Sequence, residues 1–412
     1  MNGAMNGAFL EQLLDNYRVG EVVTLPGGLY EIDAPLTIAS KPGLIVDARP
    51  ATFRFANPTP SRWLTFSGCH GLRWMGGDFY GACTLKRVID LCVKTNAAKT
   101  EPTSADFTTC VTFNDCDKAI VDDPRFQAFD RSIEVHKSDN FSLDRGEFIG
   151  IYDGKLSKFT ADGKLDVVNK DTLRSIYNVN VRNSHFFDWQ RGISRFAGGA
   201  LVAGAGDDGG QSKHLNVERL QAWDSGDNGV YGSSTFYATV KACRFFNSKG
   251  GHAAKLRGDG CRITESYAID ALKGFMVEGV GKTPDAQGAA AHGQEISGNY
   301  IERATDGAIQ IDQTTEGGLY PRHVRVCGNH IFDSGTEQHF TGKPIGPPIE
   351  LEGGAGYLVE GNIVSGYAHE CFLFIQKPSA GTYVAPNNVT GKKARVLIGS
   401  GTVDVAPFGQ AF

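Results

Sequence analysis

The sequence predicts an all-β protein built as a parallel β-helix, with a short helix at its N-terminal end. Three observations favour this class: a strand-turn-strand unit that recurs along the chain, a small polar residue at a fixed place in that unit, and one amphipathic helix before the first repeat. The length of 412 residues exceeds that of a usual compact domain. A solenoid grows along one axis, so a single β-helix can hold the whole chain.

The second half of each repeat carries the clearest pattern. The best copies are Ile296–Ile301, Val326–Ile331 and Val359–Val364, and the looser ones are Val181–Phe186, Val217–Ala222, Val240–Phe245 and Ile263–Ala268. Their first residues are 36, 23, 23, 33, 30 and 33 positions apart. A period of roughly 20–30 residues with occasional insertions is typical of a solenoid.

The fourth position of these copies predicts an internal ladder. It holds Ser184, Leu220, Cys243, Ser266, Asn299, Asn329 and Asn362. Stacked asparagines can hydrogen-bond one another and the backbone of the turn, and they tolerate a left-handed conformation. Short strands alone could also make a sandwich or a barrel. The ladder favours the β-helix.

The remaining elements follow in chain order. Residues 1–20 form the predicted capping segment, with helical apolar spacing over Ala8–Tyr17. Val22–Ile32 reads as a strand, a Pro-Gly-Gly turn and a second strand. Short strands continue at Leu36–Ile38, Leu44–Val46, Thr52–Phe55, Trp63–Phe66, Leu72–Trp74, Val111–Phe113, Ser132–His136 and Asn140–Leu143.

The β-helix is expected to span 21–382 and to carry four inserted loops. These are 150–172, 198–211, 283–292 and 335–348. Residues 383–412 form the predicted closing segment, with strands at Ala394–Ile398 and Val403–Val405.

The composition argues against several classes of ligand for this protein. A net charge of −5 argues against nucleic acid, which calls for a basic stripe. The nine cysteines include no C-x-x-C pair, so we expect small core residues, no metal and no cofactor. Asp207 and Asp208 could bind calcium, but they lack EF-hand spacing.

Localisation is predicted from what the sequence lacks. It shows no apolar run long enough for membrane insertion, and its first residues do not resemble a signal peptide. We therefore expect a chain made in the cytoplasm that stays there, or that becomes extracellular by another route, such as within a virion.

The ladder and the stretch Val23–Ile32 carry a family resemblance. The chain resembles the right-handed parallel β-helix proteins of the pectate-lyase-like superfamily, and its opening coil resembles that of bacteriophage tailspikes and related polysaccharide-degrading β-helices. The resemblance implies a right-handed β-helix, a polysaccharide ligand, a homotrimer and contacts with other virion proteins. This fold hosts lyases, hydrolases, epimerases and non-catalytic binders, so the activity depends on the site.

The strand before each ladder segment predicts that site. Alternation places Val230, Ala254, Phe275, Ile309 and Ile349 inside. Two outward columns result. The first column is Tyr231, Lys255, Met276, Gln310 and Glu350, and the second column is Ser233, Arg257, Glu278, Asp312 and Glu352.

The acidic end of the second column suggests glycoside hydrolysis. Coils stack about 4.8 Å apart, so Glu278, Asp312 and Glu352 would stand on one flat face and raise one another's pKa. Retaining glycosidases need carboxyls about 5 Å apart and inverting ones about 6.5–9.5 Å, and the column can supply either spacing. A solvated polar face is the alternative interpretation.

The basic end of the two columns suggests a lyase or an epimerase instead. The stretch Gly251–Gly258 resembles the coil that carries the lysine base in alginate- and dermatan-type β-helix lyases, which makes Lys255 the base and Arg257 its cationic neighbour. In those families an arginine follows on the next coil, where this chain has Glu278. A lysine that simply pairs with Glu278 is the alternative.

The expected function is binding and cleavage of a bacterial surface polysaccharide. The alternatives are a non-catalytic glycan-binding virion spike and a polysaccharide lyase or epimerase. Tyr231 and Trp223 could stack on sugar rings, with Gln310, Glu350 and His252 as further binding residues, although His252 could equally be a structural turn residue. Asp224 and Asp227 lie in a predicted turn, where such residues are common.

Overall fold

The structure is a computed structural model, and it divides the chain into two compact units, Met1–Gly198 and Gly199–Phe412. The described residues are 5–55, 62–82, 108–127, 129, 131–136, 138, 140–153, 157–159, 165–167, 174–177, 184–186, 201–204, 212–223, 225, 228–233, 235–248, 251–279, 291–312, 321–335, 346–376, 381–391, 395–399, 401–404 and 410–411. The predicted boundaries of the capping and closing segments, after residues 20 and 382, are not tested by this division.

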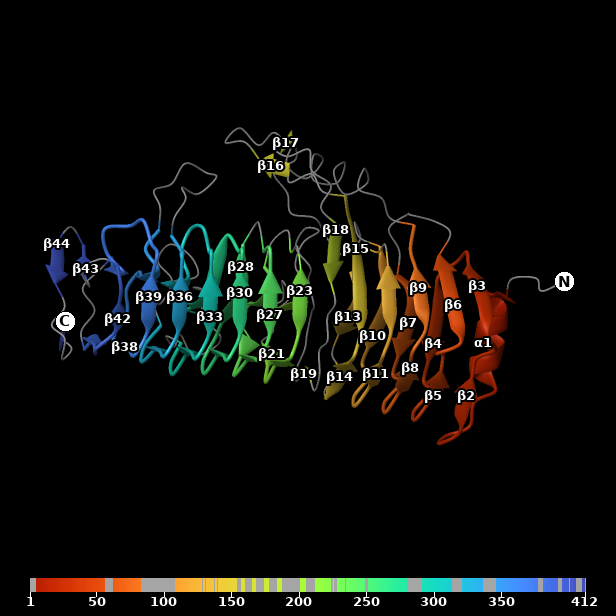
Figure 1. Cartoon of the computed structure of the whole chain (residues 1–412). Helices are drawn as coiled ribbons and strands as arrows, with labels where there is room; N and C mark the ends of the chain where they lie inside the picture. Colours follow the sequence, from red (N-terminus) through yellow and green to blue (C-terminus); the bar gives the residue numbers. More distant parts are fainter. Residues whose placement is uncertain are drawn as a thin grey trace. The chain divides into compact units, whose positions relative to one another are not determined.

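The helix α1 spans Gly7–Asp15 and starts the first unit (Figure 1). The Asn6 side chain caps it by accepting a hydrogen bond from the Phe9 backbone N–H at 3.0 Å. Its apolar side buries Leu10 and Leu14. The helix contacts strands β3 (Gly28–Ile32) and β4 (Leu36–Ala39), as expected of a cap on the first coil.

Three stacked sheets and a hairpin make up the first unit (Figure 1). The seven-stranded sheet has the order β1 (Met5–Asn6), β3, β6 (Ala51–Phe55), β9 (Asp78–Tyr80), β12 (Arg125–Gln127), β15 (Glu147–Asp153) and β18 (Arg174–Tyr177). The six-stranded sheet has the order β19 (Ser184–Phe186), β14 (Phe141–Asp144), β11 (Ile120–Asp122), β8 (Arg73–Met75), β5 (Ile45–Asp47) and β2 (Val22–Thr24). The four-stranded sheet has the order β13 (Arg131–His136), β10 (Thr109–Asn114), β7 (Arg62–Ser67) and β4, and the hairpin joins β16 (Ser157–Phe159) to β17 (Leu165–Val167).

The second unit repeats this plan. The nine-stranded sheet has the order β20 (Leu201–Gly204), β24 (Val230–Ser233), β28 (His252–Arg257), β31 (Lys273–Glu278), β34 (Ile309–Asp312), β37 (Ile349–Leu351), β40 (Leu373–Ile375), β43 (Arg395–Ile398) and β44 (Gly401–Asp404). The eight-stranded sheet has the order β22 (Asn216–Glu218), β26 (Thr239–Lys241), β29 (Arg262–Thr264), β32 (Glu295–Ser297), β35 (Arg325–Cys327), β38 (Leu358–Glu360), β41 (Tyr383–Val384) and β45 (Gln410–Ala411). The third sheet has the order β23 (Gln221–Trp223), β27 (Arg244–Phe246), β30 (Tyr267–Ile269), β33 (Tyr300–Glu302), β36 (His330–Phe332), β39 (Ile363–Ser365) and β42 (Asn388–Val389), and β21 (Ser212–Lys213) pairs with β25 (Thr235–Phe236).

Successive coils pair in parallel and confirm the predicted parallel β-helix. From β22 to β40 each coil gives one strand to each of the three large sheets of the second unit. Antiparallel pairing among the described strands is confined to β14–β19, β15–β18, β16–β17, β41–β45 and β43–β44. The last of these pairs is the predicted C-terminal closure, and β16–β17 is a hairpin within the predicted insertion at 150–172.

Two sequence-based expectations are wrong. The stretch 198–211 was expected to be an irregular insertion, but Leu201–Gly204 forms β20, which pairs in parallel with β24. The copy at Val181–Phe186 was expected to join the ladder, but Ser184–Phe186 runs antiparallel to β14. The first error arises because glycines surround the short apolar stretch of β20 and suggest a loop. The second arises because an apolar pattern marks a strand and does not show which strand it pairs with or in which direction. Asp207, Asp208, Asp224, Asp227 and most of the two later insertions lie outside the described residues.

The asparagine ladder is confirmed, and it extends one coil further than predicted. The Nδ2 atoms of Asn299, Asn329 and Asn362 each donate to the Oδ1 of the next asparagine at 2.8–2.9 Å, and the last acceptor is Asn387. Each of these Nδ2 atoms also donates to a backbone carbonyl of the preceding coil, as Asn329 does to Ile296 at 3.0 Å. Each Oδ1 also accepts a backbone N–H from that coil. The buried amides are therefore fully paired, as burial requires.

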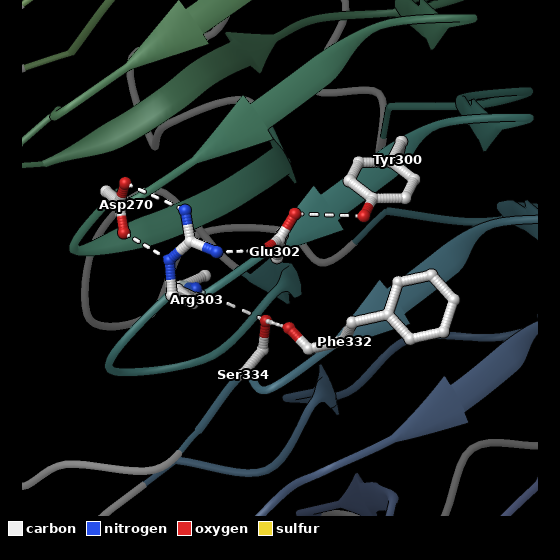
Figure 2. Close-up of polar contacts among 7 residues, drawn as sticks. Asp270, Tyr300, Glu302, Arg303, Phe332 and Ser334 are labelled. Carbon is white, nitrogen blue, oxygen red and sulfur yellow. Dashed lines mark hydrogen bonds and ion pairs between the residues drawn. The ribbon is translucent and has the colours of Figure 1, made fainter.

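Left-handed residues make the turn at the end of the third sheet. Asp270, Arg303 and Asp333 have φ values of 57°, 54° and 49° at matching places in successive coils. Figure 2 shows how Arg303 holds this turn: its Nε and Nη2 donate to Asp270 at 2.6 and 3.0 Å, and Nη1 contacts Glu302. Ser334 Oγ accepts from the Ala304 N–H at 3.2 Å and donates to the Phe332 carbonyl at 3.1 Å. The bonds of Arg303 to Asp270 and of Ala304 to Ser334 join neighbouring coils, and with the local contacts they compensate the strained turn conformation.

The core of the first unit is mainly aromatic. The rings of Tyr30, Phe53, Phe79 and Phe126 follow one another along the stack with centroids 5.2, 4.7 and 4.8 Å apart. All four are buried. Of the seven described cysteines, six are buried and none forms a disulfide, as expected of small core residues. Among the described residues, no helix is long and apolar enough to cross a membrane.

We expect Asn329→Ala to destabilise the second unit by about 3 kcal/mol. The substitution would leave the backbone N–H of Asn299 and one of its two Nδ2 hydrogens buried without an acceptor, and each such lost partner costs about 1–3 kcal/mol. Urea denaturation measures the change. The control is Asn388→Ala, which changes an exposed side chain and is expected to alter the unfolding free energy by about 0.5 kcal/mol or less. Equal losses in both variants would contradict the role given to the ladder.

Candidate functional site

The outer face of the nine-stranded sheet brings the predicted site residues together. Register pairs Tyr231, Lys255, Met276, Gln310 and Glu350 across five successive strands, which confirms the first column. Arg257, Glu278 and Asp312 also pair in order. Glu352 follows β37, and its backbone N–H donates to the Ile311 carbonyl at 2.9 Å. The second column is thereby confirmed from Arg257 onward.

Alternation explains why these side chains lie outside the coil. Phe275, Val277, Ile311 and Leu351 are fully buried between the sheets, so their neighbours along each strand must face outward. The strand β31 enters this sheet through Gly274. A Cβ there would lie 2.1 Å from the Ala308 carbonyl oxygen, so only glycine allows the two coils to approach at this point.

Glu278 forms an ion-pair cluster with both predicted cations. Its Oε1 lies 2.5 Å from Lys255 Nζ, and its Oε2 accepts from Arg257 Nε. Glu278 is 2% exposed, and the side chains of Lys255 and Arg257 are 16% and 19% exposed. Glu278 and Met276 are therefore buried although they face away from the core, so the alternative interpretation of a solvated polar face does not hold at these two positions.

The Tyr231 ring contacts the cationic end of this cluster. Lys255 Nζ and Arg257 Cζ lie 5.9 and 5.2 Å from its centroid, within the range of cation–π attraction. Burial lowers the pKa of Lys255, and the nearby charge of Glu278 acts in the opposite direction. Lys255 therefore forms the ion pair with Glu278 that was the alternative to a catalytic role, and its side chain is largely buried. It would have to leave this pair to act as a base.

Asp312 and Glu352 form the second charged element of the face. The two carboxyls share a hydrogen bond, and the pKa of Glu352 rises to about 9. Burial is the main cause, and the hydrogen bond and negative charge of Asp312 add to it. Glu352 therefore keeps its proton at neutral pH, so the pair offers a carboxylic acid beside a charged carboxylate. This is the division of roles that acid catalysis requires.

A polar pocket opens beside the first column. Its polar lining consists of His252, Lys273, Asp306, Gln310 and Glu350. Gln310 Oε1 accepts from Lys273 Nζ at 3.1 Å and lies 3.3 Å from His252 Nε2. Lys273 Nζ also lies 3.4 Å from Asp306 Oδ2. The pocket thus joins three predicted binding residues to two that the sequence did not single out.

Burial favours the uncharged form of two groups in this pocket. The pKa of His252 falls well below its usual value because of burial and the neighbouring charges of Lys255 and Lys273. The pKa of Glu350 rises because of burial, while a hydrogen bond from Gln376 Nε2 at 3.1 Å partly offsets this. His252 is therefore a neutral imidazole that can donate and accept hydrogen bonds.

Lys273, Asp306 and Gln376 were missed in the sequence. Lys273 begins β31 and Asp306 lies in the turn before β34, where outward direction cannot be read from alternation. Gln376 belongs to one further coil. Aligning Leu373–Ile375 with the earlier strands would have placed Phe374 beside Glu350 and Gln376 next along the chain.

The structure places Trp223 in a different sheet. It ends β23, and its ring stacks on Phe246 with centroids 5.5 Å apart and an interplanar angle of 17°. Tyr231 is therefore the predicted aromatic residue that the register brings into the first column.

One grouping of possible metal ligands lies elsewhere. Among the described residues, liganding atoms of His70, Asp115 and Asp117 lie within 4.8 Å of one another in the first unit. His70 Nδ1 already accepts the Asp117 backbone N–H at 3.3 Å. This grouping belongs to neither column.

Comparisons with known proteins bear on the fold. No protein-family model and no curated protein matches the chain. PfbA, a surface adhesin of Streptococcus pneumoniae, matches 99% of this chain over 98% of its own, with 12% identity and a TM-score of 0.50. Two further structures are less similar. The A-module of the mannuronan C-5 epimerase AlgE4 of Azotobacter vinelandii has 11% identity and a TM-score of 0.39, and the match covers 95% of this chain and 92% of that module. An exopolygalacturonase of Thermotoga maritima has 6% identity and a TM-score of 0.36, and the match covers 98% of this chain and 88% of that enzyme. At such identities the likeness shows the fold alone, a right-handed parallel β-helix.

The raised pKa of Glu352 predicts a pH-dependent stability. A glutamate ionises near about 4.3 in an unfolded chain, whereas Glu352 ionises at about 9 in the folded one, so the folded state binds one more proton between these values. The unfolding free energy therefore falls as pH rises through this window. Glu352→Gln cannot ionise, so its stability relative to the original chain should increase from about pH 5 to pH 9. Urea denaturation at several pH values measures this.

A matched variant controls that experiment. Glu370→Gln removes an exposed carboxyl from the same unit, and its stability should follow that of the original chain at every pH. The assignment would be contradicted if Glu352→Gln behaved in the same way as Glu370→Gln.

The cluster around Glu278 predicts a large stability loss. Glu278→Gln would leave Lys255 and Arg257 without their buried counter-charge, and breaking a buried pair costs about 3–5 kcal/mol. Glu265→Gln removes an exposed partner 3.6 Å from Lys241 and should cost about 1 kcal/mol or less. Thermal and urea denaturation compare the two. A loss at Glu278 no larger than that at Glu265 would exclude a structural ion-pair cluster.

Proposed function

We propose that the protein is a carbohydrate-active β-helix protein that binds a polysaccharide on the outer face of the nine-stranded sheet and hydrolyses a glycosidic bond there. The observation that carries this proposal is the hydrogen-bonded Asp312–Glu352 pair, in which the pKa of Glu352 is raised to about 9. A protonated carboxyl beside a charged one supplies the acid and the carboxylate that glycoside hydrolysis needs.

The spacing of this pair favours retention over inversion. Two carboxyls that share a hydrogen bond are closer than the roughly 6.5–9.5 Å of inverting enzymes and nearer to the roughly 5–5.5 Å of retaining ones. In the proposed reaction Asp312 attacks the anomeric carbon while Glu352 gives its proton to the leaving oxygen. Water then breaks the glycosyl–Asp312 bond, and its proton returns to Glu352.

The remaining residues of the two columns are assigned to binding. Tyr231 is assigned to stack its ring on a sugar, and Lys255 and Arg257 lie close to that ring. Gln310, His252 and Glu350 supply hydrogen-bonding groups along the pocket. Glu278 is assigned to holding Lys255 and Arg257 in place, since it is buried and paired with both.

Two alternatives follow from particular observations. The lowered pKa of Lys255 favours a polysaccharide lyase or epimerase that uses this lysine as its base. The fold shared with a protein described as a surface adhesin suggests a non-catalytic glycan binder. A phage tailspike role, a homotrimer, contacts with other virion proteins and an extracellular or virion location rest on the opening-coil resemblance. Light scattering of the purified chain tests the trimer.

The products from a panel of bacterial surface polysaccharides separate these functions. Hydrolysis releases reducing ends without ultraviolet absorbance, whereas a lyase product absorbs because it carries a double bond. We expect reducing ends, and we expect Asp312→Asn and Glu352→Gln to lower their release by about 10²–10⁴-fold. Glu370→Gln should retain full activity.

Three outcomes would contradict the hydrolase proposal. Full activity in both Asp312→Asn and Glu352→Gln would exclude the carboxyl pair. An absorbing product that is lost in Lys255→Met would establish the lyase. Retained binding with no product from any glycan of the panel would leave the non-catalytic binder.

A further inference from the structure

The four-stranded sheet of the first unit carries a second polar face. Thr65, Thr112 and Glu134 pair in register across β7, β10 and β13. Ser67, Asn114 and His136 form the next column. On this face, hydroxyl groups and one amide on β7 and β10 lie beside a glutamate and a histidine on β13.

The charge of Glu134 is compensated within the face. Glu134 is 2% exposed, and its Oε2 accepts from Arg62 Nε at 2.9 Å. His136 Nε2 lies 3.4 Å from the same oxygen. Arg62 is about half exposed, so the ion pair lies at the edge of the solvent. A charged ligand would have to compete with this pair, whereas an uncharged one would not.

Two buried polar atoms of this face lack a hydrogen-bond partner in the structure. They are Thr112 Oγ1 and His136 Nε2. Thr112 is 2% exposed and lies in register between Thr65 and Glu134. Leaving such groups unpaired costs about 1–3 kcal/mol each, so natural proteins seldom bury them without a partner. A ligand that pairs with both would remove this cost.

A ligand hydroxyl has the required chemistry. It can accept one hydrogen bond and donate another, so it can satisfy the Thr112 hydroxyl and the His136 nitrogen in either tautomer. Thr65, Ser67 and Asn114 are half-buried beside these atoms and can meet further hydroxyls. Asn114 Nδ2 lies 3.4 Å from Ser67 Oγ, which shows that the side chains of this column reach one another.

We propose that this face binds an uncharged, hydroxyl-rich ligand, a neutral sugar residue, through Thr112, His136 and their neighbours. The ligand is either a free sugar or one residue of a glycan chain. The site lies wholly within the first unit, so it does not depend on Asp312 and Glu352.

Binding by a cleavage-deficient chain tests this proposal. The full-length Glu352→Gln protein is titrated by calorimetry with neutral monosaccharides, neutral oligosaccharides and uronic-acid oligosaccharides. We expect neutral sugars to bind. Adding Thr112→Val, which removes the hydroxyl and keeps the shape, should weaken their binding at least about 10-fold. Thr112→Ser keeps the hydroxyl and should retain the affinity.

Two controls separate recognition from folding. Thr24→Val changes an exposed threonine in another sheet of the same unit and should leave binding unchanged. Thr112→Val should melt at or above the temperature of its parent, because it removes a buried unpaired group. Binding of monosaccharides and oligosaccharides alike identifies a free-sugar site, and binding of oligosaccharides alone identifies a chain site.

The proposal is overturned if no neutral sugar binds, if only uronic-acid oligosaccharides bind, or if Thr112→Val binds as tightly as its parent. None of these results concerns cleavage. The hydrolase proposal is judged separately from the release of reducing ends, so either proposal can fail alone.

Discussion

Parallel hydrogen bonding between successive coils is the constraint on which the candidate site depends. It fixes the register of the nine-stranded sheet, so residues far apart in sequence stand about 4.8 Å from one another. Lys255, Glu278 and Asp312 come from three different coils, and only this register makes them neighbours. The asparagine ladder supports the same register from inside, since a slip of one residue would leave its buried amides unpaired.

The outer face of this sheet joins two kinds of charged group. At one end Glu278 neutralises Lys255 and Arg257, and this cluster is already closed by its own ion pairs. At the other end Glu352 keeps its proton, because it is partly buried and shares a hydrogen bond with the negatively charged Asp312. The Glu278 cluster can hold Lys255 and Arg257 in place, and the Asp312–Glu352 pair can supply an acid and a carboxylate. The geometry therefore favours hydrolysis by the carboxyl pair over elimination by Lys255.

Much of the fold could be predicted from the sequence, because similar segments recur along the chain at regular intervals. The copies at Ile296, Val326 and Val359 predicted the coil and the ladder, and the strand before each copy predicted the two columns. Ser184 was misplaced because its strand pairs antiparallel with β14, and nothing in its local pattern shows the direction of its partner. Asn387 was missed because it lies only 25 positions after Asn362, whereas the asparagines before it are 30 and 33 positions apart.

The site was predicted less completely, because burial on an outer face depends on what packs over it. Alternation showed that Glu278 faces away from the core, but it could not show that the side chain is buried and paired with two cations. Lys273 and Asp306 lie where strands begin, outside the reach of alternation. The proximity of Asp312 to Glu352 followed from coil spacing. Their shared hydrogen bond and the raised pKa of Glu352 required the structure.

A carbon-13 NMR titration of the glutamate side-chain carboxyls tests the central claim most directly, and it needs no knowledge of the glycan. One glutamate signal should titrate at about pH 9, and it should be missing from Glu352→Gln. In Asp312→Asn the same signal should move toward the ordinary glutamate range, since the charge that helps to raise the pKa of Glu352 is gone. If every glutamate carboxyl titrates near about 4, Glu352 is ionised at neutral pH and cannot serve as the acid.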